Sequence, residues 1–397
     1  MLKKIRVEQL EIGMYVHSLC GAWLSHDFWR TSFLLDKPEL LAKLQDSPVQ
    51  EVWIDTARGA GASINTSMSA VIASTQDTAP APLSQELQRA AEICAEAKEA
   101  VVQMFSEVRM GQAVDVVMAE TLVNAISNSV ERHPYALLSV ARLKSADSYT
   151  YMHSVAVSGL MVALARTMGW RSAELLQAGM AGLLHDIGKA KTDLTVLNKP
   201  GALSDEEFGH MKQHPVKGHA ILQTIIDDED VLDACLHHHE RMDGKGYPHG
   251  LSGSQLSQLA RMTAICDVYD AITSNRPYKK GWSPSDALQH MAQWCPSHLD
   301  ADLFETFVRT IGLYPVGSLV RLQSGLLGVV CASAQHSMST PKVIAFYHIA
   351  TQRMLRPAKL LDLEQLRDER IVASENPEKW PFSNLDSLWR KAAQSLN

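Results

Sequence analysis

The sequence predicts a mainly α-helical protein, with an all-helical central domain between a small α+β N-terminal domain and a small β-rich C-terminal module. Three observations support this fold class: apolar residues at three-and-four spacing through the centre, short apolar runs at both ends, and a Pro- and Ala-rich segment after the first part. At 397 residues, 46% of them hydrophobic, the chain is long enough for several domains with a sizeable core. We expect a domain over 1–56, a flexible linker over 57–84, a helical domain over 85–312 and a β-rich module with a tail over 313–397.

Charge and cysteine content narrow the class of protein. The formal net charge of -7 argues against a broad surface for nucleic acid or membrane, so an anionic ligand would need a local positive cluster. The six cysteines are scattered without a CxxC pair, which is typical of reduced thiols in the cytoplasm. The N-terminus lacks a signal-peptide pattern, and no stretch approaches the roughly 18 apolar residues of a membrane helix. We therefore expect a soluble, cytoplasmic protein without a membrane span.

The elements at the start of the chain are short. Apolar runs separated by turn residues predict strands near 5–10, 13–16 and 49–55, and a short helix at 39–45. The composition then changes to Ala, Ser, Thr, Gly and Pro as far as Ser84. Such a segment buries too little apolar surface to order itself, which indicates a linker.

Helical periodicity begins at about residue 85. Two strongly periodic segments, 87–105 and 113–130, fit a bundle or a dimer interface as well as the simpler interpretation of core helices. After Tyr314 and Pro315 the pattern changes again, and the runs 316–322, 325–330 and 342–349 predict the strands of the C-terminal module.

Histidine and aspartate residues carry the chemical information. His153 shares the apolar face of a helix predicted over 150–168, although a single histidine there is more often a hydrogen-bonded core residue. The next helix opens near Ser172 and ends in His185 and Asp186. A buried carboxylate is costly unless it is paired or bound to metal, and one that bridges two cations meets that need. Lys189 follows one turn later and is suited to a phosphate oxygen.

Three further segments add ligand-type side chains. A capping box at Ser204 and Glu207 starts a helix with His210 and His214, and spacing alone leaves either histidine as the ligand. His237, His238 and His239 precede a glycine-rich turn that contains Tyr247.

The third segment pairs carboxylates with cations. Asp267 and Asp270 share a helix face at i and i+3. The stretch 275–280 is the densest positive cluster near them, and it fits an anion-binding turn or a merely solvated one. Ligands dispersed over several helices indicate a two-metal hydrolase, and no Cys₄, HExxH, P-loop or G-x-S-x-G pattern competes with that interpretation.

These motifs resemble a known family. His185-Asp186 with Gly188-Lys189 is similar to the signature of the HD superfamily of metal-dependent phosphohydrolases. The string HHExxDGxGYPxG at 238–250 and DxxDAxxxxRPY at 267–278 resemble its HD-GYP branch, and the similarity covers roughly 133–312. The N-terminal pattern resembles a domain of unknown function that often precedes HD-GYP domains. The resemblance implies hydrolysis of the bacterial messenger cyclic di-GMP to linear pGpG, sometimes on to GMP.

The resemblance also implies roles for single residues. The implied metal ligands are His153, His185, Asp186, His214, His238, His239 and Asp267. Asp186 would bridge two divalent ions, iron or manganese, and His214 is selected over His210. The residues implied to contact substrate are Lys189, Tyr247, Arg276 and Lys279. Lys189 and Arg276 would stabilise charge on the phosphate oxygens, and Asp147 occupies a position implied in proton transfer.

One departure and two alternatives qualify the resemblance. Some family members have a glutamate one turn before the first histidine that supports a third metal, and this sequence has Tyr149 there. The alternatives are another HD-type nucleotide phosphohydrolase, which does not account for the GYP and RPY strings, and a non-catalytic scaffold that binds cyclic di-GMP or proteins. Diguanylate cyclase domains, which would meet the GYP surface, and a second copy of the chain are the expected protein partners.

Overall fold

The chain folds as two compact units, Met1–Asp77 and Thr78–Asn397, and each is described by itself. The computed structural model describes residues 2–7, 10, 13–19, 33–35, 41, 51–55, 83–141, 149–197, 199, 201–275, 281–334, 337–382 and 385. Among these residues, no helix is both long and apolar enough to cross a membrane.

The first unit contains a small antiparallel sheet. Its strands, in the order β1-β4-β2-β3, are β1 (Leu2–Arg6), β2 (Tyr15–Leu19), β3 (Phe33–Leu34) and β4 (Glu51–Asp55). Val52 and Ile54 are two residues apart on β4 and therefore face the same side, where they pack with Val16 in a small core. The strand predicted at 49–55 is confirmed by β4, whereas those predicted at 5–10 and 13–16 overlap β1 and β2 only at 5–6 and 15–16. The helix predicted at 39–45 lies, apart from Leu41, outside the described residues.

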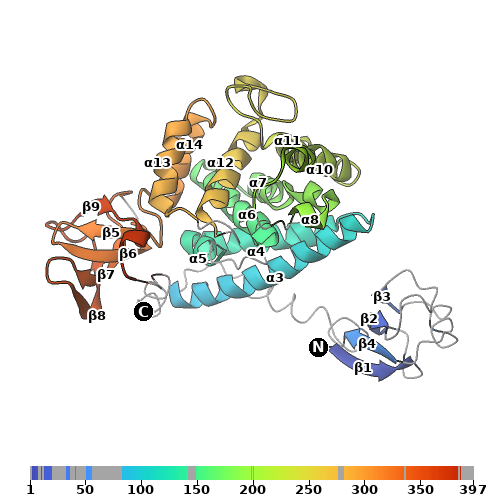
Figure 1. The fold of residues 1–397 in the computed structure, drawn as a ribbon, viewed down its shortest axis with the longest axis horizontal. Helices are drawn as coiled ribbons and strands as arrows, with labels where there is room; N and C mark the ends of the chain where they lie inside the picture. The colour runs from blue at the N-terminus through green and yellow to red at the C-terminus, as the bar shows by residue number, and fades with distance from the viewer. Residues whose placement is uncertain are drawn as a thin grey trace. The chain divides into compact units, whose positions relative to one another are not determined.

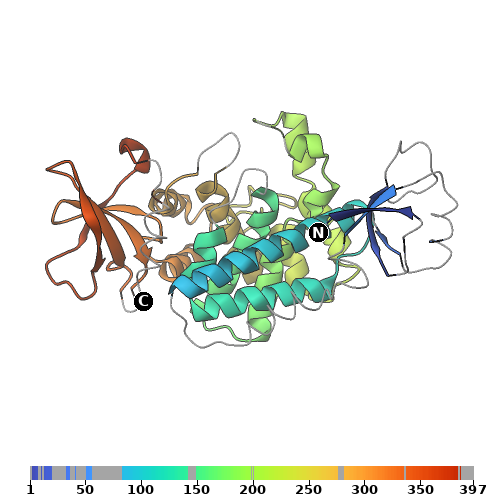
Figure 2. The same ribbon diagram turned by 90° about the horizontal axis from the view of Figure 1, so that it is seen from below.

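The second unit is mainly helical, as predicted. Its helices are α3 (Leu83–Arg109), α4 (Val116–Arg132), α5 (Pro134–Ala141), α6 (Tyr149–Thr167), α7 (Ala173–Leu184), η4 (Ile187–Lys191), α8 (Leu194–Leu197), α9 (Asp205–Met211), α10 (His214–Leu222), α11 (Glu229–His237), η5 (Gly253–Gln255), α12 (Gln258–Thr273), α13 (Pro284–Trp294) and α14 (Ala301–Ile311). Figure 1 shows α3 along one edge of this body with α6 and α7 inside it, and Figure 2 shows α3 and α4 side by side.

The buried helix α6 organises the helical body. It contacts α3, α4, α5, α7, α12 and α14. Its closest neighbour is α7, because a Cβ atom at Gly182 would lie 2.8 Å from the Cα atom of Ser158 on α6. The two periodic segments at the start of this unit are core helices, with Phe105 of α3 and Ile126 of α4 fully buried.

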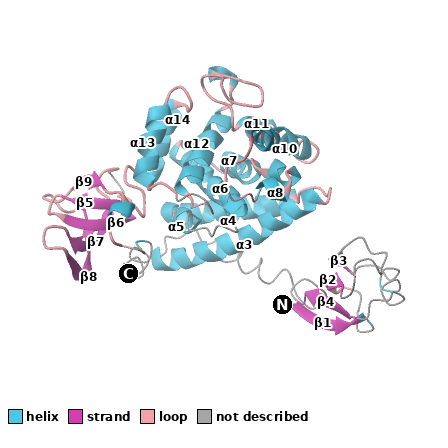
Figure 3. Ribbon diagram, viewed as in Figure 1, coloured by secondary structure: helices cyan, strands magenta, loops and turns pink. Residues whose placement is uncertain are grey.

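The C-terminal part of the second unit is a five-stranded antiparallel sheet, which confirms the predicted β-rich module (Figure 3). Its strands, in the order β8-β7-β6-β5-β9, are β5 (Leu319–Leu322), β6 (Leu326–Ala332), β7 (Lys342–His348), β8 (Arg353–Asp362) and β9 (Ile371–Ser374), and η6 (Pro377–Lys379) follows. Alternate residues of β7 enter two different apolar clusters, one with Ile344 and the other with Val343. Leu87 of α3 and Tyr135 of α5 pack on the first cluster, which joins the sheet to the helices.

Candidate metal centre

Seven ligand-type side chains meet inside the helical body. They form two groups in which the ligand atoms lie within 4.8 Å of one another: Asp186, His214, His238 and His239 in one, and His153, His185 and Asp267 in the other. These are the same seven residues that the family resemblance implied as metal ligands. His210, the alternative to His214, is exposed and belongs to neither group of described residues.

Local sequence explains how these side chains reach one point. Helix α7 ends at Leu184, so His185 and Asp186 occupy the turn between α7 and η4. The following glycine, Gly188, allows η4 to approach α10, because a Cβ atom there would lie 1.9 Å from the carbonyl oxygen of His214. This close approach brings Asp186 Oδ1 to 3.2 Å from His214 Nε2.

Three imidazoles are oriented by backbone carbonyl groups that precede them in the chain. The Nδ1 atoms of His185, His214 and His238 lie 2.8, 2.7 and 2.8 Å from the carbonyl oxygen three residues earlier. A carbonyl oxygen only accepts hydrogen bonds, so Nδ1 of each ring carries a proton, and the neutral form of such a ring has its lone pair on Nε2. The Nε2 atoms of His214 and His238 are only 3.2 Å apart, and two lone pairs that face each other favour a cation between them.

The fourth imidazole lies between two carboxylates of α12. His153 Nε2 is 2.9 Å from Asp267 Oδ1, and its Nδ1 is 2.6 Å from Asp270 Oδ2. Asp270 thus orients a candidate ligand from behind, a role that the sequence analysis did not assign to it. Its i+3 spacing from Asp267 was the available signal, but that spacing does not reveal which histidine it faces.

The two central carboxylates are held as anions. Burial raises the pKa of Asp186, but His185 and Lys189 outweigh it and hold that pKa well below its usual range. Lys189 Nζ is 2.5 Å from Asp186 Oδ2. Burial likewise raises the pKa of Asp267, and the hydrogen bond and charge of His153 bring it well below the usual range. The site therefore presents fixed negative charge toward the imidazole nitrogens.

The imidazoles of His238 and His239 are held neutral. Burial, reinforced by the neighbouring histidines, lowers the pKa of His238 well below its usual value. Burial also lowers the pKa of His239 to about 3, against the opposing effect of Asp267. Neutral imidazoles and ionised carboxylates are the forms that bind metal. Asp186 Oδ1 is buried and has no hydrogen-bond partner in the described part of the chain, so the donor set fits divalent cations.

The centre opens into a cleft of about 2840 Å³. Several cationic side chains line the cleft, including Lys189, Lys199 and Lys245. Positive charge is therefore concentrated in the cleft although the net charge of the chain is negative. Tyr247 lines it as well, with its ring 4.8 Å from that of His239 at 31°. The turn after Tyr247 is held by Glu240, whose Oε1 accepts the backbone N–H groups of His249 and Gly250 at 2.6 and 2.9 Å.

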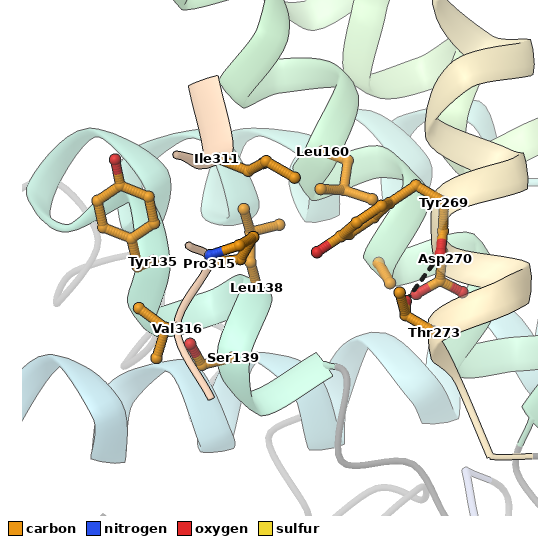
Figure 4. Close-up of a pocket in the computed structure, with 11 residues that line it drawn as sticks. Tyr135, Leu138, Ser139, Leu160, Tyr269, Asp270, Thr273, Ile311, Pro315 and Val316 are labelled. Carbon is orange, nitrogen blue, oxygen red and sulfur yellow. Dashed lines mark hydrogen bonds between the residues drawn. The ribbon is translucent and has the colours of Figure 1, made fainter. Parts of the chain in front are cut away.

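A second, smaller cavity of about 490 Å³ lies between the helices and the start of the β module (Figure 4). Leu138, Tyr269 and Val316 line it, and so does Asp270, the residue whose carboxylate contacts His153. None of the seven candidate ligands lines this cavity, so the larger cleft is the candidate substrate site.

Three residues implied in catalysis or substrate binding lie outside the described residues: Asp147, Arg276 and Lys279. Tyr149 begins α6, four residues before His153. Of the residues implied to contact substrate, Lys189 and Tyr247 are the two that the structure places in the cleft.

Comparison with known proteins identifies the class. A family model described as HD domain matches residues 124–303, and a domain of unknown function, DUF3391, matches residues 2–119. Bd1817, described as an HDG"Y"P protein from Bdellovibrio bacteriovorus, is a solved structure with TM-score 0.51 and 20% identity that covers 77% of this chain and 98% of that chain. That likeness concerns the fold alone. The fold and the site thus define an HD-domain protein.

Two curated relatives narrow the assignment. The "Cyclic di-GMP phosphodiesterase PA4108" of Pseudomonas aeruginosa is 50% identical over 100% of this chain and 97% of that protein. The "3'3'-cGAMP-specific phosphodiesterase 1" of Vibrio cholerae is 32% identical over 45% of this chain and 42% of that protein. The chain belongs to the HD-GYP family of the HD superfamily, with the N-terminal domain of unknown function ahead of it. The predicted family is confirmed, and the four domain boundaries stay a prediction.

Proposed function

We propose that the chain hydrolyses cyclic di-GMP and releases linear pGpG, with GMP as a further product where the second diester is also cut. The observation that carries this proposal is the convergence of seven ligand-type side chains, six of which line a cleft that also carries several cationic side chains. Full-length similarity to a protein named as a cyclic di-GMP phosphodiesterase supports the substrate.

The proposed ligands are the seven residues of the two groups, with two divalent transition-metal ions, iron or manganese, as cofactors. Asp186 is suited to bridge the ions because its Oδ2 lies 3.3 Å from His185 Nε2 and its Oδ1 lies 3.2 Å from His214 Nε2. When bound, such ions lower the pKa of a coordinated water and polarise phosphate oxygens.

The remaining chemistry belongs to side chains around the ligands. Lys189 lies beside Asp186 and lines the cleft, so its ammonium group is suited to a non-bridging phosphate oxygen. Tyr247 would contact the substrate from the wall next to His239. From the sequence motifs we propose that Arg276 and Lys279 also bind the substrate and that Asp147 transfers a proton. We further propose that the chain acts in the cytoplasm; diguanylate cyclase partners and a homodimer stay predictions.

Incubation of metal-loaded protein with cyclic di-GMP, followed by chromatographic separation of the nucleotides, tests this proposal. We expect pGpG to be the first product as cyclic di-GMP disappears, with GMP following it where the second diester is also cut. A protein that binds the nucleotide without turnover would support the scaffold alternative. Hydrolysis of nucleoside monophosphates or triphosphates in place of the cyclic dinucleotide would support another HD-type phosphohydrolase.

A further inference from the structure

We propose that Phe208, with Lys212 beside it, forms a platform on which a purine base of the substrate stacks at the rim of the cleft. This inference rests on the proposed function and adds a specificity-determining residue to it. Phe208 lies on α9 and lines the cleft, yet 47% of its surface stays exposed. About half of this residue is therefore accessible to a ligand, while the Lys212 ammonium group lies over one face of the ring.

Phe208 is connected to the metal centre by a series of ring contacts. The ammonium group of Lys212 lies 4.7 Å from the centroid of the Phe208 ring and 5.3 Å from that of Tyr247. The Tyr247 ring in turn lies 4.8 Å from the ring of the candidate ligand His239. His239, Tyr247, Lys212 and Phe208 thus form a series in which each group contacts the next, from the proposed scissile-phosphate site to the cleft rim.

The chemistry of this surface matches a nucleotide. Aromatic rings bind bases through their π faces, and lysine binds phosphate as a compact charge. Phe208 and Lys212 are four residues apart at the end of α9, so a single helical turn presents both groups on one side. A substrate whose phosphate reaches the metal centre would therefore place its base beyond Tyr247, over Phe208.

The platform is also held in position before substrate binds. The helix α9 begins with a capping box, in which Ser204 and Glu207 exchange hydrogen bonds with each other's backbone N–H groups. Glu207 additionally pairs with Lys199 at 2.6 Å. These contacts fix the first turn of α9, immediately before Phe208, and reduce the ordering that substrate binding would require.

The test compares a substrate with purine bases and one without. Full-length wild type, Phe208→Ala, Phe208→Tyr and Leu194→Ala are assayed on cyclic di-GMP and on cyclic di(1-deoxyribose phosphate), the same cyclic diester without its bases or any other aromatic ring. Leu194 is the matched control because it is 46% exposed and lies outside the described lining of the cleft. We expect Phe208→Ala to lower kcat/KM for cyclic di-GMP by about 5- to 100-fold, mainly through KM, because a stacked base is lost. Hydrolysis of the base-free diester should be unchanged, and Phe208→Tyr and Leu194→Ala should resemble wild type.

Each other outcome overturns a definite part of the inference. An equal loss on both diesters would show that Phe208 supports the fold of the cleft rather than the base. Wild-type turnover of cyclic di-GMP with no loss in Phe208→Ala would overturn the platform and leave the proposed function intact. Failure of the wild type to hydrolyse cyclic di-GMP would overturn the proposed function and the platform together.

Discussion

At the scale of single residues, the partner of each imidazole Nδ1 atom is as informative about metal binding as the Nε2 atom that faces the candidate metal site. Carbonyl groups orient His185, His214 and His238, whereas a carboxylate, that of Asp270, orients His153. An anionic partner raises the basicity of the ring nitrogen that faces the metal more than a carbonyl group does. His153 is therefore the candidate ligand whose binding depends most on a neighbouring side chain.

Replacement of Asp270 tests that dependence. We expect Asp270→Ala to weaken metal binding by about 10- to 100-fold, and Asp270→Asn to weaken it less because the amide oxygen still accepts the Nδ1 proton. Competition with a chelator, followed by elemental analysis, measures the affinity. Asp233→Asn is the matched control, since Asp233 contacts His237 at the same 2.6 Å distance and His237 belongs to neither ligand group. Equal metal affinity in the Asp270 and Asp233 variants would contradict a positioning role.

The number of ions is a second prediction at this scale. A third ion needs another anionic oxygen near His153, and the sequence has Tyr149 at the i−4 position where such a ligand would come from. A phenol with a pKa near 10 is mostly neutral at pH 7 and binds hard divalent ions poorly. Elemental analysis of the purified protein should find about two transition-metal ions per chain, and Tyr149→Glu should raise this to about three. Reproducible binding of three ions by the wild type would refute the argument.

At the scale of elements, sequence patterns predicted what is local and missed what depends on packing. The turn at His185 and Asp186 was predictable because a buried apolar helix ends there. Lys212, which follows α9, and Tyr247 are distant in sequence, and their contact depends on how the end of α9 lies relative to the turn after α11. No periodicity encodes that relation. The partner of Asp270 was missed for the same reason, because spacing places it on a face of α12 but does not show that α6 lies opposite.

The turn that carries Tyr247 offers the clearest prediction for an element. Glu240 is buried and accepts two of its backbone N–H groups, so Glu240→Ala should leave both without an acceptor and cost about 1–3 kcal/mol of stability. We expect a lower Tm and a higher KM for cyclic di-GMP, with unchanged metal content because Glu240 belongs to neither ligand group. Glu240→Gln keeps one acceptor oxygen and serves as the milder comparison. Loss of metal from Glu240→Ala would mean that the turn also supports the ligands.

At the scale of the whole molecule, the division into two units predicts which part is needed for chemistry. Every described residue of the candidate centre and its cleft lies between Thr150 and His298, within the second unit. That unit has its own large core, to which α3 contributes residues from Ala90 to Val108. A shortened chain that begins at Thr78 should therefore fold and keep its turnover per bound metal within about twofold of the full-length value.

A chain that begins at Val116 serves as the contrast. It lacks α3, including the buried Phe105, so it should fail to fold stably. Circular dichroism, metal content and nucleotide chromatography on both chains decide the matter. If the Thr78 chain is folded and loaded with metal but does not turn over cyclic di-GMP, the first unit takes part in building the active site.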